Sequence, residues 1–230
     1  MAKRPVFLVD EIKCYSTQYY DFEFFPGFSR SQKEKNIISL HNAFLSIHPN
    51  LRILEISSKS PDAIGRSLSA FNLNYNVDDV SYPLECVFQS SKVFEKGGPF
   101  RELLTVSPIE AKRSPLLHEN GNLTGFVCDG KSFPLIPETF FYDWLYANAI
   151  QGNTELTSSL VLYDAFTDIE FNPNKSINCQ ARSAAIYVAL VRTGTLEKAL
   201  ISPENFKSIV YHDSLTQNDS PVQMTFEDLL

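Results

Sequence analysis

The chain has 230 residues, of which 43% are hydrophobic and 20% charged, and its formal net charge is −7. This composition excludes a disordered or low-complexity protein, and the length suits one large domain with a sizeable core. The negative charge argues against a broad basic surface wrapped around nucleic acid, because affinity for nucleic acid comes largely from neutralised phosphates.

The first third of the chain shows clear element signals. In chain order, we expect strands at 5–9 and about 19–25, a helix from about 30 to 48, a strand at 51–57 and a short helix opened by Pro61. Residues 67–75 are ambiguous. Ser29 and Gln32 form a capping-box pattern at the start of the long helix. One face of this helix carries Ile37, Leu40, Phe44 and Ile47.

The rest of the chain is dominated by helix signals. We expect helices at 83–95, from Ser107-Pro108 onward, at 137–150, 154–163, 177–193 and 203–210, and a hairpin at 123–135 around the turn Asp129-Gly130. Strands do not alternate regularly with helices, which favours an α+β fold in a single domain over 1–230. Residues 211–230 are expected to form a loosely held tail.

The sequence shows neither the pattern of a signal peptide or membrane span nor that of a metal site. The apolar run after the basic start ends at Asp10, which is too short for a signal peptide, and no stretch approaches the roughly 18 apolar residues of a membrane span. We therefore expect a cytoplasmic protein that does not enter a membrane. The four cysteines form no C-x-x-C pair, so buried free thiols are expected, and the scattered histidines predict neither a metal site nor a metal cofactor.

The most informative stretch is SYPLECVFQSSKVF, residues 81–94. On a helix, Glu85, Phe88, Gln89 and Lys92 would share one face. A ring beside a carboxylate, an amide and an amine is typical of the wall of a ligand site. The alternative is that Glu85 only stabilises the first turn of its helix and that Lys92 is a surface lysine.

Several blocks of the sequence resemble the NADAR family of NAD- and ADP-ribose-linked proteins. SYPLECVFQSSKVF carries the family's proline, glutamate, F-Q and K-F in order, GRSLSAFN resembles its upstream Gly-aromatic-Ser-Asn-Phe element, and SPIEAK resembles its Pro-x-Glu-Ala segment. Asp168 and Asn178 stand where the family has an Asp and an Asn, although its usual Trp-Gly is absent there. Blocks such as FFPGFSRSQK and YDAFTDIEFNP are similar to the NADAR antitoxins paired with Dar-type toxins, which ADP-ribosylate guanine in DNA.

The resemblance implies a NADAR-like domain that hydrolyses ADP-ribose from the guanine amino group in DNA, with the cognate toxin as a candidate partner. Glu85 is the first catalytic candidate. If the reaction passes through a Schiff base, Lys59 and Lys92 compete for the role of the amine. Lys59 follows the strand predicted at 51–57 and corresponds to a basic residue that the family commonly keeps, so it ranks slightly ahead, and Lys92 is assigned to ligand binding.

The expected substrate-binding residues are Ser69, Phe71, Gln89, Lys92, Phe94, Asp168 and Asn178. Phe71 and Phe94 are alternatively core residues, and Asn178 is alternatively a helix cap. A cluster of Arg30, Lys33 and Lys35 is either a solvated helix end or a local contact to DNA phosphate. Two other functions stay open: cleavage of a small metabolite, such as a riboflavin-pathway intermediate, and binding of ADP-ribose or NAD without turnover. If the protein removes ADP-ribose from guanine in DNA, we expect weak affinity for unmodified DNA and a small basic rim around Glu85.

Overall fold

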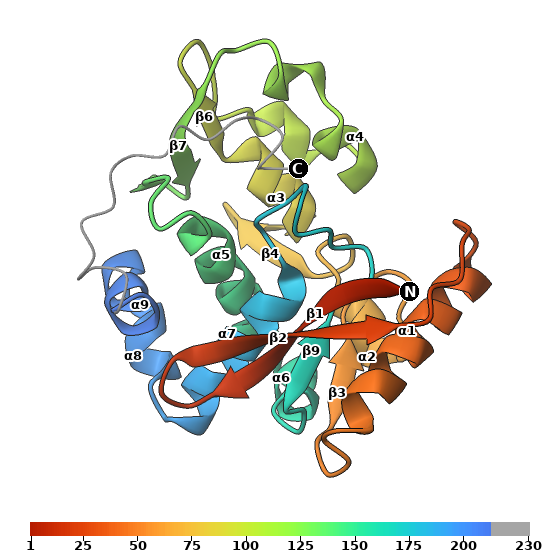
Figure 1. Cartoon of the computed structure of the whole chain (residues 1–230). Helices are drawn as coiled ribbons and strands as arrows, with labels where there is room; N and C mark the ends of the chain where they lie inside the picture. The colour runs from red at the N-terminus through yellow and green to blue at the C-terminus, as the bar shows by residue number, and fades with distance from the viewer. Residues whose placement is uncertain (213–230) are drawn as a thin grey trace. The chain divides into compact units, whose positions relative to one another are not determined.

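The computed structural model describes residues 1–212, and the chain divides into two compact units. Unit 1 comprises Met1–Ser69, Asn153–Asn172 and Cys179–Glu197, and unit 2 comprises Ala70–Gly152, Pro173–Asn178 and the chain from Lys198 onward. Both units contain helices and strands, which confirms the α+β class (Figure 1). The single-domain organisation stays a prediction, and all but the first two residues of the expected tail at 211–230 lie outside the described residues.

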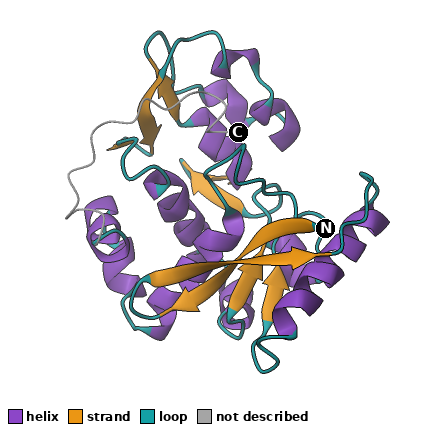
Figure 2. Cartoon of the chain, in the orientation of Figure 1, coloured by secondary structure: helices purple, strands orange, loops and turns teal. Residues whose placement is uncertain are grey.

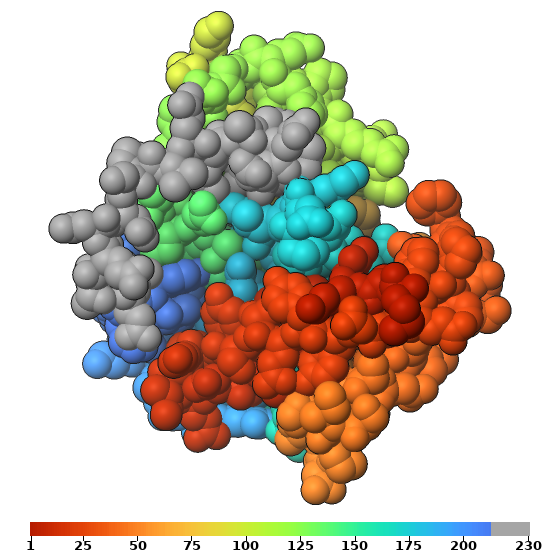
Figure 3. Space-filling model, viewed as in Figure 1, coloured from red at the N-terminus to blue at the C-terminus, as the bar shows by residue number. Residues whose placement is uncertain are grey.

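Unit 1 is built on a four-stranded sheet in the order β2-β1-β9-β3. Strands β1 (Ala2–Asp10) and β2 (Cys14–Phe22) form a long antiparallel hairpin, drawn in red in Figures 1 and 3. Strand β9 (Ala165–Thr167) pairs antiparallel with β1 and parallel with β3 (Ile53–Glu55). The sequence predicts β1 and β3, but its strand at about 19–25 overlaps β2 only over 19–22, because pairing with β1 places β2 at Cys14–Phe22. Strand β9 was not predicted, because it forms through its pairing with β1 and β3.

Helices cover both faces of this sheet (Figure 2). The helices of unit 1 are α1 (Arg30–Leu45), α2 (Ala63–Ser67), α6 (Thr154–Leu160) and α7 (Gln180–Arg192), and α8 (Leu196–Leu200) follows α7. Phe44 of α1 belongs to the same apolar cluster as Val6 of β1. Arg182 of α7 lies 6.0 Å from the ring centroid of Tyr15 on β2. Val6 and Tyr15 point to opposite faces in the register of the hairpin, so α1 and α7 pack on opposite sides.

The ends of α1 and α7 differ in part from the predictions. Ser29 caps α1 and accepts a hydrogen bond from Gln32 N at 3.3 Å, as predicted. The reciprocal half of the capping box is missing, because Gln32 Oε1 has no hydrogen-bond partner among residues 1–212. Ile47 lies beyond the end of α1 and is 65% exposed, so its assignment to the apolar face is wrong. Helix α7 begins at Gln180 with Cys179 as its N-cap, so Asn178 is not the cap.

Unit 2 holds shorter strands and several helices. Its elements are β4 (Asn74–Val77), β5 (Val80–Pro83), α3 (Leu84–Ser90), β6 (Lys92–Phe94), α4 (Pro108–Lys112), β7 (Leu123–Cys128), β8 (Lys131–Phe133), α5 (Phe140–Gln151) and α9 (Pro203–Val210), with 3-10 turns at Arg101–Leu104 and Pro115–Leu117. Helix α5 contacts α3 and α9. The hairpin β7–β8 turns at Asp129 and Gly130 with positive φ angles of 48° and 71°, as the sequence predicts.

The helix predicted over 83–95 is wrong in its second half. Helix α3 ends at Ser90, and Lys92–Phe94 form strand β6, which pairs antiparallel with β7. The hydroxyls of Ser90 and Ser91 both donate to the carbonyl oxygen of Val87, at 2.9 and 2.7 Å. Such side-chain bonds compete with the backbone ladder and favour the end of a helix here.

The remaining composition-based expectations concern thiols, metals and membranes. The four cysteines are free and buried, as predicted. Within residues 1–212, no helix is long and apolar enough to cross a membrane. The same residues hold no group of three or more His, Cys, Asp or Glu side chains that could bind a metal ion.

Candidate active site

The first turn of α3 places Glu85 in unit 2. Its backbone N–H donates to the Ala70 carbonyl at 2.9 Å, and its carboxylate accepts a hydrogen bond from Gln89 Nε2, also at 2.9 Å. A carboxylate is favoured at a helix N-terminus by the helix dipole. Glu85 is nevertheless only 6% exposed, which is unusual for a carboxylate that merely stabilises a helix end. Its side chain is therefore preorganised and largely shielded from water.

The amine of Lys92 is buried in the same unit. Lys92 is 1% exposed, and its Nζ lies 5.2 Å from the ring centroid of Phe88, one turn from Glu85 on α3. Burial lowers the pKa of Lys92 from 10.5 to about 8, the negative charge of Glu85 opposes this change, and the positive charge of Lys112 adds to it. The structure thus gathers the predicted carboxylate, ring, amide and amine, although Lys92 comes from β6 and not from the helix face.

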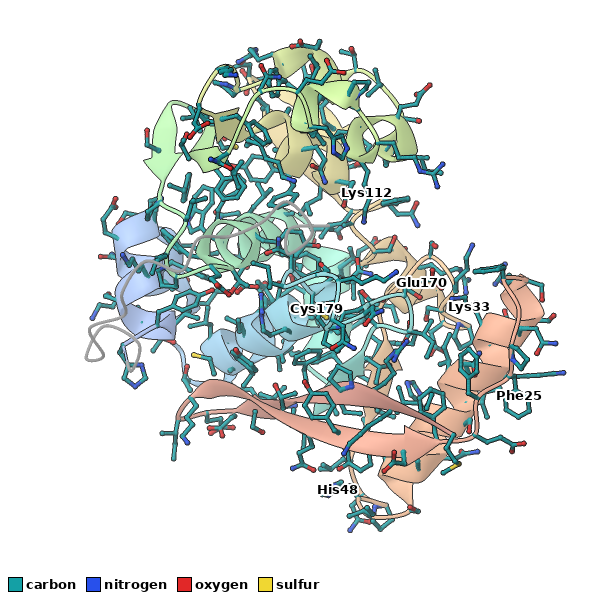
Figure 4. All side chains as sticks on the ribbon, turned by 45° about the horizontal axis from the view of Figure 1, so that its top comes forward. Phe25, Lys33, His48, Lys112, Glu170 and Cys179 are labelled. Carbon is teal, nitrogen blue, oxygen red and sulfur yellow. The ribbon has the colours of Figure 1, made fainter. Side chains whose placement is uncertain are left out.

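Lys112 is a charged residue of this site that the sequence argument did not single out. It stands in the last turn of α4, which packs against α3, and it is labelled in Figure 4. Its place in the family-like block SPIEAK is the signal that could have identified it. Together with Lys92 it gives unit 2 two cationic groups that act on one another, a suitable neighbourhood for an anionic ligand.

Three of the predicted substrate-binding residues have buried oxygen atoms without a hydrogen-bond partner among the described residues. These atoms are Ser69 Oγ, Gln89 Oε1 and Asn178 Oδ1. A buried acceptor left unpaired costs about 1–3 kcal/mol, so such atoms are rare and call for an explanation. Ser69 belongs to unit 1, and Gln89 and Asn178 belong to unit 2, where a bound ligand that donates hydrogen bonds would satisfy Gln89 Oε1 and Asn178 Oδ1.

The two predicted stacking residues differ in their surroundings. Phe94 is 4% exposed and packs in an apolar cluster with Cys86 and Phe100, which is the core role that the sequence left open for it. Phe71 is half-buried and keeps part of its ring accessible. Among the two, Phe71 is therefore the ring that a ligand can reach, and stacking by either residue stays a prediction.

Unit 1 contains a buried acidic group that the sequence argument missed, Glu55 at the end of β3. Glu55 is fully buried and accepts hydrogen bonds from Thr167 Oγ1 at 2.6 Å and Ile169 N at 2.8 Å. Because the Thr167 hydroxyl donates to this carboxylate, its oxygen accepts from His41 Nε2 at 2.8 Å. Burial lowers the pKa of His41 to about 4, so the ring is neutral and carries its proton on Nε2. A glutamate inside the apolar run LRILEIS is the signal that could have revealed this network.

Asp168 follows β9 and lies at the same sheet edge as Lys59, which follows β3. Parallel strands bring these two predicted site residues to one edge, and both are half-buried. Asp168 accepts hydrogen bonds from Gln180 Nε2 and from the Glu170 backbone, each at 3.0 Å. Burial raises the pKa of Asp168 from 3.8 to about 8, and the negative charge of Glu55 adds to the rise. A partly exposed carboxyl that keeps a proton near neutral pH can donate a hydrogen bond to a ligand.

Asp168 gives a testable pH dependence of stability. An aspartate in an unfolded chain loses its proton near pH 4, whereas folded Asp168 keeps it to about pH 8 under the negative charges of Glu55 and Glu170. Between these values the folded protein binds more protons, so this group makes stability fall as the pH rises. We expect the difference in melting temperature between Asp168→Asn and wild type to move in favour of the variant from pH 5 to pH 8. A difference that stays constant over this range would contradict the protonated state.

Comparison with known proteins agrees with the resemblance seen in the sequence. Residues 2–220 match the model of a protein family described as DarT1-associated NADAR antitoxin, so the match covers almost the whole chain. A search of curated proteins found no significant match. The NADAR family is generally one of N-glycosidase hydrolases. The chain therefore belongs to the family of DarT1-associated NADAR antitoxins.

Proposed function

We propose that this protein hydrolyses the N-glycosidic bond between ADP-ribose and the guanine amino group in DNA, and so reverses the damage done by a DNA ADP-ribosyltransferase toxin in the cytoplasm. Family membership supports the antitoxin role and the reaction class. The observation that carries the proposal is the buried amine of Lys92 in the electrostatic field of the shielded carboxylate of Glu85. A carboxylate and an amine with a lowered pKa are the two groups that the cleavage of a glycosylamine needs.

One route is direct hydrolysis at the anomeric carbon. The C1′–N bond to guanine breaks as a water oxygen attacks C1′, and Glu85 takes the proton from that water. The leaving guanine nitrogen gains a proton from an acid group, for which the protonated amine of Lys92, in the same unit as Glu85, is a candidate. In this route the negative charge of Glu85 also stabilises the oxocarbenium-like transition state.

The other route opens the ribose ring. The lone pair of the glycosylamine nitrogen expels the ring oxygen and forms an imine with guanine, as Glu85 takes the proton from that nitrogen and delivers it to the ring oxygen. The neutral amine of Lys92 or Lys59 then adds to C1′ and gives up a proton, and guanine takes a proton on its amino nitrogen as its bond to C1′ breaks. Water hydrolyses the resulting Schiff base, which frees the lysine before the sugar recloses. The sequence placed Lys59 slightly ahead, but the full burial and lowered pKa of Lys92 favour Lys92 as the amine.

The remaining site residues hold the ligand in this proposal. In unit 2, Gln89 Oε1 and Asn178 Oδ1 are acceptors without partners among the described residues, and they suit the ribose hydroxyls or the amino groups of a base. Ser69 Oγ is a further acceptor of this kind in unit 1. Lys112 suits the diphosphate, and Phe71 offers a stacking surface. Since ADP-ribose supplies so many contacts, the enzyme needs little affinity for unmodified DNA, in keeping with a net charge of −7.

An oligonucleotide that carries ADP-ribose on guanine tests the proposal directly. We expect the protein to release free ADP-ribose and the unmodified oligonucleotide, both visible by mass spectrometry. Turnover of a riboflavin-pathway metabolite without turnover of the oligonucleotide would favour the small-metabolite reading. Tight binding of ADP-ribose with turnover of neither substrate would favour a binding module.

A further inference from the structure

Strand β2 forms one edge of the four-stranded sheet in unit 1 (Figure 1). The N–H of Val9 on β1 donates to the Asp164 carbonyl next to β9, so the odd-numbered residues of β1 direct their backbone groups toward β9 and the even-numbered ones toward β2. Even-numbered residues of β2 lie opposite even-numbered residues of β1, so Thr17, Tyr19 and Asp21 direct their N–H and C=O groups away from the sheet. None of these groups forms a hydrogen bond with another residue of the range 1–212.

Proteins usually protect such an edge against pairing with another chain, and β2 lacks the usual means of protection. The opposite edge of the sheet, β3, has only three residues. Strand β1 carries Pro5, which has no N–H, on the side that faces β9 and beyond the residues that β9 pairs with. Strand β2, in contrast, has nine residues in unbroken register with β1 and contains no proline, lysine or arginine. It is therefore suited to pair with a further strand.

The side chains along β2 are compatible with this pairing. Thr17, Gln18 and Tyr19 are exposed, and Asp21 is the only charged residue of the strand. Threonine and tyrosine are favoured in strands, and β-branched and aromatic side chains pair well across neighbouring strands. Tyr19 is 53% exposed, so a second strand would cover apolar surface as well as backbone groups.

The strand is complementary to itself when two copies of β2 run antiparallel. One register pairs all nine residues of Cys14–Phe22 with those of the second copy. It places Gln18 opposite Gln18 of the second copy, on a two-fold axis, and Thr17 opposite Tyr19. In this register the outward backbone groups of each strand face those of the other, so the hydrogen-bond ladder continues across the axis.

The charges at the two ends of β2 select the same register. Lys13 precedes the strand and Glu23 follows it, and both side chains are exposed and form no ion pair with another described residue. The full-length register brings each Lys13 opposite Glu23 of the second copy, once at each end. A shift of two residues in one direction would place Glu23 opposite Glu11, and a shift in the other direction would place Lys13 opposite Phe25. Opposite charges across neighbouring strands stabilise a pairing, and like charges destabilise it.

We propose that two copies of this chain form a two-fold symmetric dimer through antiparallel pairing of β2 with β2. The added strand gains backbone hydrogen bonds for both copies, and the alternating side chains and terminal charges fix the register. The two-fold symmetry uses the open edge of each copy, so the assembly closes at the dimer.

Sedimentation equilibrium of the full chain tests the dimer. We expect a reversible monomer–dimer equilibrium with a Kd below about 100 μM. Thr17→Pro removes an N–H that points away from β1, once in each copy, so it should raise Kd about tenfold or more with little change in melting temperature. Tyr19→Lys leaves the backbone intact, introduces the charge that natural edges carry, and should weaken the dimer as well. Leu162→Lys, at a side chain that is also 53% exposed, should dimerise like the wild type.

Charge reversal tests the register. Lys13→Glu and Glu23→Lys each place like charges opposite one another at both ends of the paired strands, so each variant alone should raise Kd about tenfold at low salt. When the two variants are mixed, with one isotopically labelled, every pair again joins opposite charges, and native mass spectrometry should detect a heterodimer of nearly wild-type stability. Glu197→Lys, at another exposed glutamate of unit 1, should leave Kd unchanged. If mixing forms no heterodimer, the proposed pairing is wrong.

A cysteine on the two-fold axis provides a covalent test. Residues directly opposite in a non-hydrogen-bonded pair have Cα atoms about 4.5 Å apart, a distance that a disulfide can span. Gln18→Cys should therefore form a cross-linked dimer on mild oxidation. The wild type, whose four cysteines are buried, and Leu162→Cys should stay uncross-linked. Equal cross-linking of Gln18→Cys and Leu162→Cys would contradict the inference.

Three further results would overturn the dimer. One is a monomer at every concentration up to about 100 μM. Another is a dimer that Thr17→Pro and Tyr19→Lys leave intact, since a different surface would then hold it. The third is a chain that stays monomeric but binds the purified toxin and loses this binding in the same two variants, because the edge would then belong to the toxin. None of these measurements uses an ADP-ribosylated substrate, so their outcome is independent of the proposed hydrolysis.

Discussion

Glu85→Gln is expected to lower kcat on ADP-ribosylated guanine by about 10²–10⁴-fold, the usual range for loss of a general acid–base group. In both chemical routes the carboxylate of Glu85 carries a negative charge and exchanges a proton, and an amide does neither. The change is nearly isosteric. The new side-chain oxygen can still accept the hydrogen bond from Gln89 Nε2, which is 2.9 Å from Glu85 Oε1 in the wild type. Release of ADP-ribose in single-turnover assays measures the loss.

The control variant for this prediction is Glu102→Gln, which removes an exposed carboxylate from the same unit. It should keep wild-type activity, and both variants should melt within a few degrees of the wild type. Survival of cells that express the toxin provides the second measurement. If Glu85→Gln protects these cells as well as the wild type does, the protein neutralises the toxin without this reaction, as a non-catalytic binding module would.

Local signals predicted those elements of the fold whose boundaries depend on nearby residues. The capping box at Ser107 with Pro108 in the first turn, the Asp129-Gly130 hairpin and the helix at 203–210 all form where the sequence places them. Each depends on contacts within a few residues, so single-sequence reasoning can find it.

Elements that depend on distant partners could not be predicted from the sequence. Strand β9 has three residues, and it is a strand because β1 and β3 flank it. Lys92–Phe94 continue a helical pattern but pair with β7, a segment about 30 residues further along the chain. In both cases tertiary pairing overrides the local preference.

The residues of the candidate site likewise divide into those that the local sequence predicts and those that depend on distant contacts. The sequence motif identified Glu85 and Gln89 together, since they are one turn apart on α3. The ranking of Lys59 over Lys92 could not take burial into account, because the depth of Lys92 depends on β6, α3 and the elements that cover them. Glu55 was missed because its hydrogen-bond donors, Thr167 and Ile169, lie far away in the sequence, and the burial of its carboxylate depends on these distant contacts.

Reductive trapping should identify Lys92 as the nucleophile if the reaction passes through a Schiff base. Borohydride reduces the imine between ADP-ribose and the lysine to a stable secondary amine, which peptide mass spectrometry locates. We expect the wild type to carry the adduct on Lys92 and Lys92→Met to lose it, together with a drop in kcat of about 10³-fold or more. The adduct should form faster as the pH rises through about 8, because the neutral amine is the attacking species.

Lys59→Met is the matched control, since it removes an amine that is half-buried and belongs to unit 1. This variant should keep both the adduct and most of the activity. The opposite pattern, with the adduct lost only in Lys59→Met, would assign the nucleophile to Lys59 and leave Lys92 to bind the ligand, as the sequence alone suggested. An active wild type that forms no adduct at any pH would exclude both lysines as nucleophiles. The direct route, in which Glu85 activates water, would then account for the reaction, and the burial of Lys92 would serve to hold a cation near the departing ADP-ribose.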